Sequence, residues 1–217
     1  MEKKKLIVGI LVFGSLWGFA ECVIGPMLRD ASLPAGAIMT GVFAFGLMAA
    51  SRMFFKVRGM ALGMGLVAGA MRLFNPFGGC QLCSGIAIMA EGLLFEILWF
   101  GVPTALDEFS SLTNKISLGI VTSYSIYVLG YVITQVLTPV LSSAGFFIGN
   151  LIGIIPQILA SGLLAALIGG VMAPVLFFLR NVDLSKVRNH VYYPVALGIS
   201  VFCWFVVVSN SPWIAGI

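Results

Sequence analysis

Apolar residues run in seven long segments along the chain, and short polar or charged connections separate one segment from the next. A transmembrane helix needs roughly 20 predominantly apolar residues, and an open sheet cannot satisfy its backbone hydrogen bonds in lipid. The pattern therefore predicts an all-α fold, a polytopic integral membrane helix bundle of six or seven transmembrane helices, with residues 1–217 forming a single domain. The expected segments are 6–26, 34–51, 59–74, 82–102, 116–138, 147–179 and 192–208.

The sixth segment is longer than one straight span requires, because the hydrocarbon core of a bilayer is only about 30 Å thick. Pro156 could kink a single long helix. Alternatively, the first third of the segment, Phe146 to Pro156, could be re-entrant. Two full spans here would move the following basic connection to the other side of the membrane, which the charge pattern disfavours.

The composition supports a membrane protein, since 60% of the residues are hydrophobic and only 9% are charged. A soluble domain carries about 25% charged residues. The short connections leave no room for a separate soluble catalytic domain. The basic start before an apolar run resembles a signal peptide, but the run exceeds a typical h-region and Glu21 interrupts it, so we expect a retained first span.

The basic residues follow a one-sided pattern. If the N-terminus is cytoplasmic, ten of the 12 Lys and Arg residues fall on the inner side, and only Arg29 and Arg72 lie toward the outside. This bias predicts a multi-pass protein of the cell membrane with a cytoplasmic N-terminus. The net charge of +4 therefore reflects topology, and we expect no nucleic-acid partner. The inner set is Lys3, Lys4, Lys5, Arg52, Lys56, Arg58, Lys115, Arg180, Lys186 and Arg188.

Three ionisable residues within the apolar segments are expected to face the bundle interior. Small residues mark packed helix faces in membranes, and Glu21 and Arg72 each lie on a stripe of small residues. Glu91 lies three turns after Cys80, whereas Glu96 projects about 140° away from Glu91. The two stripes are Gly14, Gly18, Glu21 and Gly25 in the first segment, and Ala61, Gly65, Ala68 and Arg72 in the third.

The polar residues of the apolar segments fall mainly in the outer half of the membrane, with Glu96 as the exception. This distribution predicts a pocket that opens to the outside, not a continuous channel. Ionisable groups inside a membrane are costly and indicate functional sites. The candidate solute-binding residues are Glu21, Arg72, Asn75, Phe77, Gln81, Glu91, Tyr131, Asn150 and Gln157.

Each candidate has an expected role. Arg72 neutralises one of the two carboxylates, and the other stays free for a cationic or hydrogen-bonding solute. The amides supply hydrogen bonds, and Phe77 and Tyr131 could stack on a planar solute. The alternative, given equal weight, is a structural ion pair with one protonated Glu.

The Cys80-Gln81-Leu82-Cys83 sequence follows two glycines at a helix start, where a thiol pKa is lowered. It could perform thiol–disulfide exchange, form half of a soft-metal site, form a structural disulfide, or simply pack. A four-cysteine metal site would also need Cys22 and Cys203, and the apolar surroundings of Cys203 predict a lipid-facing position. Any metal is therefore undetermined.

No catalytic constellation or cofactor site is evident. His190 is the only histidine and lies in a basic connection, so a histidine-based proton-transfer or nucleophile arrangement is absent. The chain also lacks a glycine-rich phosphate loop with a lysine, so it carries no nucleotide site. Any energy for transport must come from other chains.

In size, inner-loop charge and outer polar pocket, the chain resembles the substrate-binding S components of energy-coupling factor (ECF) transporters. Ile10, Gly14 and Gly18 stand where that family typically shows Ala-x-x-x-Ala. The resemblance implies capture of a vitamin-like or metal solute, docking of Gly14 and Gly18 onto a transmembrane coupling subunit, and ATPases on further chains. Close helix packing within the bundle is the alternative role for the two glycines.

Two other classes stay open. Cys22 in the first segment and Cys80 and Cys83 at the fourth also resemble the cysteines of membrane thiol–disulfide oxidoreductases of the CcdA and DsbD type. A non-catalytic subunit of a larger membrane complex is the third class. A redox protein should lose its activity with Cys22 or Cys80, whereas a solute receptor should tolerate that loss unless the cysteines form a structural bridge.

Overall fold

The computed structural model describes residues 3–74, 81–102, 111–141, 148–182 and 188–210. These residues are almost wholly helical, and no strand occurs among them. Six helical rods are long and apolar enough to cross a membrane, whereas the rod of 13 residues at Met60–Arg72 is shorter. The chain is thus an all-α, multi-pass membrane protein, as the hydrophobic pattern predicts.

The first two rods are each interrupted by a π-helical segment. The first comprises α1 (Lys3–Phe19), η1 (Ala20–Ile24) and α2 (Gly25–Asp30), and the second comprises α3 (Ala35–Ile38), η2 (Met39–Ala44) and α4 (Phe45–Phe55). The remaining helices are α5 (Met60–Arg72), α6 (Gln81–Leu98), α7 (Leu112–Leu141), α8 (Ile148–Phe177) with the 3-10 turn η3 (Phe178–Asn181), and α9 (Asn189–Ser209).

The sixth predicted segment is one helix. Helix α8 continues through Pro156 and Pro174, so its first third does not leave the helix as a re-entrant segment would. A proline removes one backbone hydrogen bond within a helix. Membrane helices tolerate this loss because neighbouring helices can satisfy the freed backbone group. The structure therefore favours the single long span.

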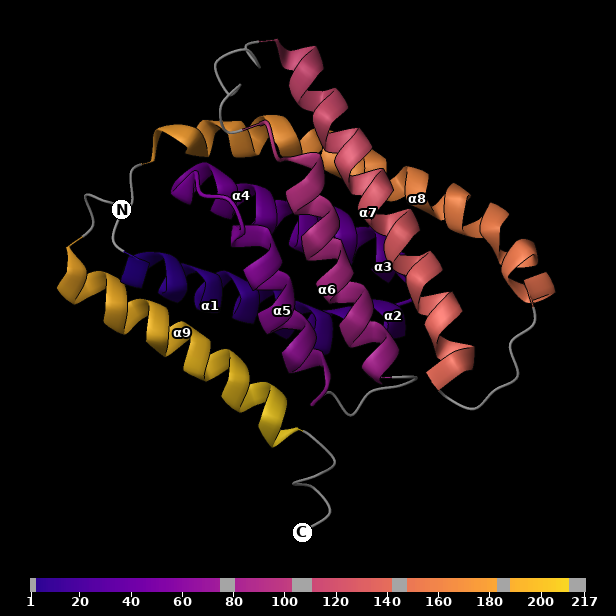
Figure 1. Cartoon of the computed structure of the whole chain (residues 1–217), viewed down its shortest axis with the longest axis horizontal. Helices are drawn as coiled ribbons and strands as arrows, with labels where there is room; N and C mark the ends of the chain where they lie inside the picture. Colours follow the sequence, from indigo (N-terminus) through magenta and orange to yellow (C-terminus); the bar gives the residue numbers. More distant parts are fainter. Residues whose placement is uncertain (1–2, 75–80, 103–110, 142–147, 183–187, 211–217) are drawn as a thin grey trace.

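Helices α9, α1, α5, α6, α7 and α8 contact one another in that order, and α4 packs against α8, α1 and α5 to close the arrangement (Figure 1). The Ala35–Phe55 rod is the central element, with 72% of its most apolar window buried, compared with 22% for α9. Phe45 on α4 contacts Phe95 on α6 and Trp99 directly after α6, and the rings of Phe95 and Trp99 stack at 4.7 Å. The Trp99 indole N–H donates to Thr122 Oγ1 on α7 at 3.0 Å.

Basic residues gather at one end of the bundle. Lys5 lies 5.9 Å from the Tyr192 ring, Arg58 lies 3.9 Å from the Phe100 ring, and Lys115 lies 5.4 Å from the Phe177 ring. Arg52 forms an ion pair with Glu96 at 2.9 Å. These contacts join the start of α1, the α4–α5 turn, the end of α6, the start of α7, the end of α8 and the start of α9.

Gly14 and Gly18 do not form a free docking face, which corrects the partner-interface expectation. Both are buried where α1 packs on α5. A Cβ at Gly14 would lie 2.7 Å from Val67 Cβ and 2.9 Å from the Met64 carbonyl oxygen. A Cβ at Gly18 would lie 2.9 Å from the Met71 sulfur. The glycines therefore permit close helix packing within the bundle, the alternative that the sequence left open.

Cys203 is also not lipid-facing, contrary to the prediction from its apolar surroundings. It is 2% exposed and belongs to a buried cluster with Cys22, Met71 and Val207. The prediction failed because α9 packs along α1, and this contact covers one face of an otherwise exposed helix.

Candidate functional site

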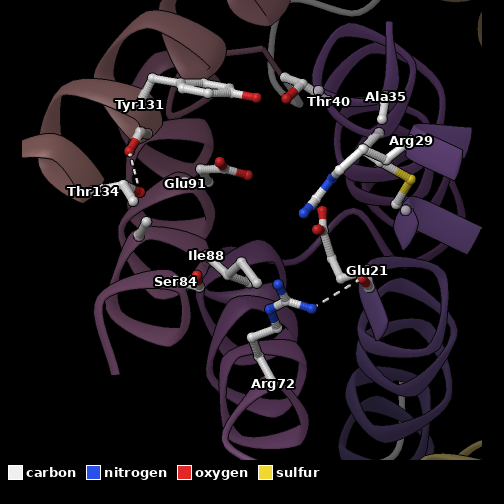
Figure 2. A pocket seen from close by; sticks show the side chains of 15 residues that line it. Glu21, Arg29, Ala35, Thr40, Arg72, Ser84, Ile88, Glu91, Tyr131 and Thr134 are labelled. Atoms are coloured by element: carbon white, nitrogen blue, oxygen red, sulfur yellow. Dashed lines mark hydrogen bonds between the residues drawn. The ribbon is translucent and has the colours of Figure 1, made fainter. Parts of the chain in front are cut away.

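A cavity of about 380 Å³ lies between the first two rods, α5, α6 and α7 (Figure 2). We call it the charged cavity because two carboxylates and two guanidinium groups line it. Its polar lining is Glu21, Arg29, Thr40, Arg72, Ser84, Glu91, Tyr131 and Thr134. The remaining lining is small or apolar, and Ala87 and Ile88 form part of it.

Glu21 lies in the π-helical segment η1 and Thr40 lies in η2, and both side chains line the cavity. In η1 the Gly25 N–H donates to the Ala20 carbonyl, and in η2 the Phe45 N–H donates to the Thr40 carbonyl. Both bonds span five residues, which widens the turn. Such single-turn segments are rare and frequently occur at functional sites.

A proline accounts for the first of these segments. Pro26 has no N–H, and in a regular helix its ring would clash with the carbonyl four residues earlier. The wider turn of η1 directly precedes it. For η2 the sequence offers no comparable signal.

Glu21 is surrounded by groups that offset its charge. The Trp17 indole N–H donates to Glu21 Oε1 at 3.3 Å. Arg72 donates to the Glu21 backbone carbonyl at 3.2 Å, and the charges of Arg72 and Arg29 both act on the Glu21 carboxylate. Arg72 is buried, with 8% of its surface exposed. Arg72 thus lies beside Glu21, although its hydrogen bond goes to the backbone rather than to the carboxylate.

Glu91 lies on the opposite wall, and its carboxyl group points into the cavity (Figure 2). It forms no hydrogen bond or ion pair with any residue that the structure describes; within those ranges the one ion pair is between Arg52 and Glu96. The acidic neighbour that acts on Glu91 is Glu21. A carboxyl group that is half-buried in a membrane-spanning helix and has no partner is costly, so Glu91 has the character of a binding group.

A second cavity of about 510 Å³ lies between α3, α7 and α8. We call it the amide cavity because Gln135 and Gln157 line it together with Tyr127, Tyr131 and Ser161. The two cavities share Ala35, Gly36 and Tyr131. The Tyr131 hydroxyl lies against Gly36, where a Cβ would overlap it, and its ring lies 4.5 Å from that of Tyr127.

Several predicted binding residues meet in these two cavities. Glu21, Arg72, Glu91 and Tyr131 line the charged cavity, and Tyr131 and Gln157 line the amide cavity. Gln81 lines neither of them. The remaining candidates, Asn75, Phe77 and the side chain of Asn150, lie outside the described residues, as does Cys80.

Four polar residues line the charged cavity but are not among the candidates predicted from the sequence: Arg29, Thr40, Ser84 and Thr134. The hydrophobic pattern places Arg29 in an outer connection, and the π-helical turn changes the helical phase between Glu21 and Arg29. Thr40 has no sequence signal, because its turn is widened without a nearby proline. Thr134 could have been found, since it follows Tyr131 by three residues on the polar face of α7.

The cysteines differ in state. Cys83 is disulfide-bonded and has no exposed surface. Cys22 and Cys203 are free and buried, and the Cys22 thiol donates to the Met71 carbonyl at 3.9 Å. No group of three or more His, Cys, Asp or Glu side chains among the described residues could hold a metal ion.

Comparisons with protein-family models, with characterised proteins and with solved structures gave no match to the chain. The resemblance to ECF S components therefore stays a proposal.

Proposed function

We propose that the chain is the solute-binding component of an ECF-like importer and captures a small solute in the charged cavity. The main support for this proposal is the carboxyl group of Glu91. It points into a cavity and has no hydrogen-bond or ion-pair partner among the described residues. Small-molecule sites are concave, with a few convergent polar groups in an otherwise apolar lining. The charged cavity has this character.

The distribution of charge supports a solute with a cationic or hydrogen-donating group. Two arginines act on Glu21, whereas Glu91 has no basic neighbour that acts on it. A solute cation at Glu91 would supply the missing counter-charge and remove the cost of the unpaired carboxyl group. Arg29, which is exposed at the cavity, can receive an acidic group of the same solute.

The position of the cavity supports capture from the outside. Arg72 ends α5, Ser84 lies in the first turn of α6, and Thr134 lies in the second half of α7. The basic residues lie at the opposite ends of these helices. Basic connections are retained in the cytoplasm, so the proposal places the N-terminus inside the cell and the cavity toward the outer face of the cell membrane.

The proposal requires partners for energy, because the sequence carries no phosphate loop. A transmembrane coupling subunit and ATPases on other chains would supply it. The Gly14 and Gly18 face is excluded as the docking surface, because α5 covers it.

Native mass spectrometry of gently purified protein, with and without reductant, tests the proposal. We expect a small-molecule adduct that survives reductant and is lost in Glu91→Gln. Gly198→Ala is the control, because nothing lies within 4 Å of a Cβ at that position. A two-dalton shift that exchanges with a thiol partner, without an adduct, would favour the oxidoreductase. The absence of both the adduct and the two-dalton shift would favour a non-catalytic subunit.

A further inference from the structure

We propose that the solute is a two-part molecule. Its cationic group binds Glu91 in the charged cavity, and an uncharged, planar, hydrogen-bonding body occupies the amide cavity beyond Tyr131. This inference rests on the proposed function and names the class of solute that the site takes.

The two cavities adjoin. Ala35, Gly36 and Tyr131 line both of them, so a single side chain on α7 and one short stretch of α3 separate the two spaces. Tyr131 extends across the rim of the charged cavity toward the second rod (Figure 2). A solute that enters one cavity therefore meets the other at the Tyr131 ring.

The amide cavity contains side-chain amides that lack hydrogen-bond partners among the described residues. Gln135 and Gln157 lie within membrane-spanning helices, yet neither side chain hydrogen-bonds to any of the described residues. An amide without a partner is unfavourable in lipid. The amide cavity, which is lined by two such amides and the Ser161 hydroxyl, is therefore suited to a polar occupant and poorly suited to an acyl chain.

The shape and lining of the amide cavity suit a flat, uncharged group. The rings of Tyr127 and Tyr131 lie together at 4.5 Å, and Ile154, Ile158 and Leu164 complete the apolar lining. Aromatic faces prefer to stack on flat groups. None of the residues lining this cavity carries a charge, so the cavity selects an uncharged planar group that can hydrogen-bond at its edge.

The two cavities together are large enough for a solute with two parts. The cavities measure about 380 and 510 Å³, and small-molecule sites typically measure about 300–1,000 Å³. A small ammonium group alone would leave most of this space empty, whereas a molecule with a ring and a charged arm would fill both parts.

The test uses three defined probes on the full chain in detergent: tyramine, which joins a phenol to an ammonium group, and its two fragments, ethylamine and 4-ethylphenol. Thermal unfolding is followed as a function of probe concentration, because a ligand that binds the folded state raises the unfolding temperature. We expect tyramine to stabilise the protein at concentrations about tenfold below ethylamine, which corresponds to about 1.4 kcal/mol from the stacked ring.

Two variants show which cavity binds the ring of tyramine and which binds its ammonium group. Gln157→Leu should reduce the advantage of tyramine over ethylamine to roughly threefold or less, and cooperative thermal unfolding of this variant without any probe shows that it is folded. Glu91→Gln should remove the response to both amines.

The outcomes separate this inference from the proposed function. Equal potency of tyramine and ethylamine, with both responses lost in Glu91→Gln, would overturn the two-part solute and leave capture at Glu91 standing. An absent response to both amines, or responses that persist in Glu91→Gln, would overturn the proposed function itself.

Discussion

The carboxyl group of Glu91 occupies the space that a side chain at residue 130 would fill. A Cβ built on Gly130 of α7 would overlap Glu91 Oε1. Gly130→Ala should therefore push the carboxyl group away from its place in the charged cavity. The far end of a flexible side chain moves cheaply, and Ala favours a helix by up to about 1 kcal/mol over Gly, so we expect stability to change by less than about 1 kcal/mol while solute binding falls about tenfold or more.

Adduct occupancy in native mass spectrometry and the unfolding temperature of the same sample measure the two effects. Gly198→Ala on α9 is the matched control, because a Cβ there meets nothing within 4 Å. Unchanged occupancy in Gly130→Ala would show that the position of the Glu91 carboxyl group does not matter for binding.

Glu96 and Glu91 lie on the same helix, but substitution of each should have a very different effect on the stability of the protein. Glu96 accepts from Arg52 at 2.9 Å and from the backbone N–H groups of Gly59 and Ala61 at 2.8 and 3.2 Å. Arg52 is only 2% exposed, so Glu96→Ala leaves a buried cation and the first turn of α5 without their acceptor. Breaking a buried pair costs about 3–5 kcal/mol.

Glu91→Gln breaks no hydrogen bond or ion pair among the described residues, and we expect the free energy of unfolding to change by less than about 1 kcal/mol. Denaturant titration of the two variants in detergent gives the comparison. A loss of stability in Glu91→Gln as large as that in Glu96→Ala would mean that Glu91 is structural, and the capture proposal would lose its main support.

Much of the fold follows from hydrophobic patterning, because lipid leaves the backbone little choice but helix. The seven segments and the inward direction of Glu21 and Arg72 could be predicted this way. The angular separation of Glu91 and Glu96 follows from helix geometry alone. The structure places Glu91 at a cavity and Glu96 in a buried ion pair.

The rest depends on contacts that periodicity does not encode. A small-residue stripe such as Gly14 and Gly18 marks close packing, but only the structure shows that α5 is the helix it meets. The placement of Arg29 and Thr40 depends on two π-helical turns, each of which rotates the following residues relative to a regular helix. Cys203 is buried because α9 packs on α1, and no local pattern signals that neighbour.

The α1–α5 contact gives a prediction on packing. Gly14→Leu would force a side chain into Val67 and the Met64 carbonyl, and we expect it to destabilise the protein by about 1–3 kcal/mol, since overpacking displaces neighbouring backbone. Gly198→Leu, at an open position of α9, should leave the unfolding temperature nearly unchanged. Equal stability of the two variants would reopen Gly14 as a free surface for a partner.

Cys22 provides a test of the oxidoreductase alternative. Its thiol is 4% exposed and donates to the Met71 carbonyl, so in the folded protein it should react with N-ethylmaleimide far more slowly than after unfolding in SDS. Cys22→Ser should keep the solute adduct, because Cys22 lines neither cavity. Rapid alkylation of Cys22 in the folded protein, or loss of all activity in Cys22→Ser, would instead favour thiol chemistry.

The orientation of the charged cavity decides whether capture is from the outside. Asp30 ends α2 near the cavity, Arg58 lies at the basic end, and both are exposed. With Cys22 and Cys203 buried and Cys83 bonded, a cysteine at either exposed position should be the accessible thiol in each variant. In intact cells, a membrane-impermeant maleimide should label Asp30→Cys strongly and Arg58→Cys only after the cells are opened, because basic connections stay in the cytoplasm. The reverse labelling pattern would show that the cavity faces the cytoplasm. Capture of solutes from the outside would then be the wrong function for this chain.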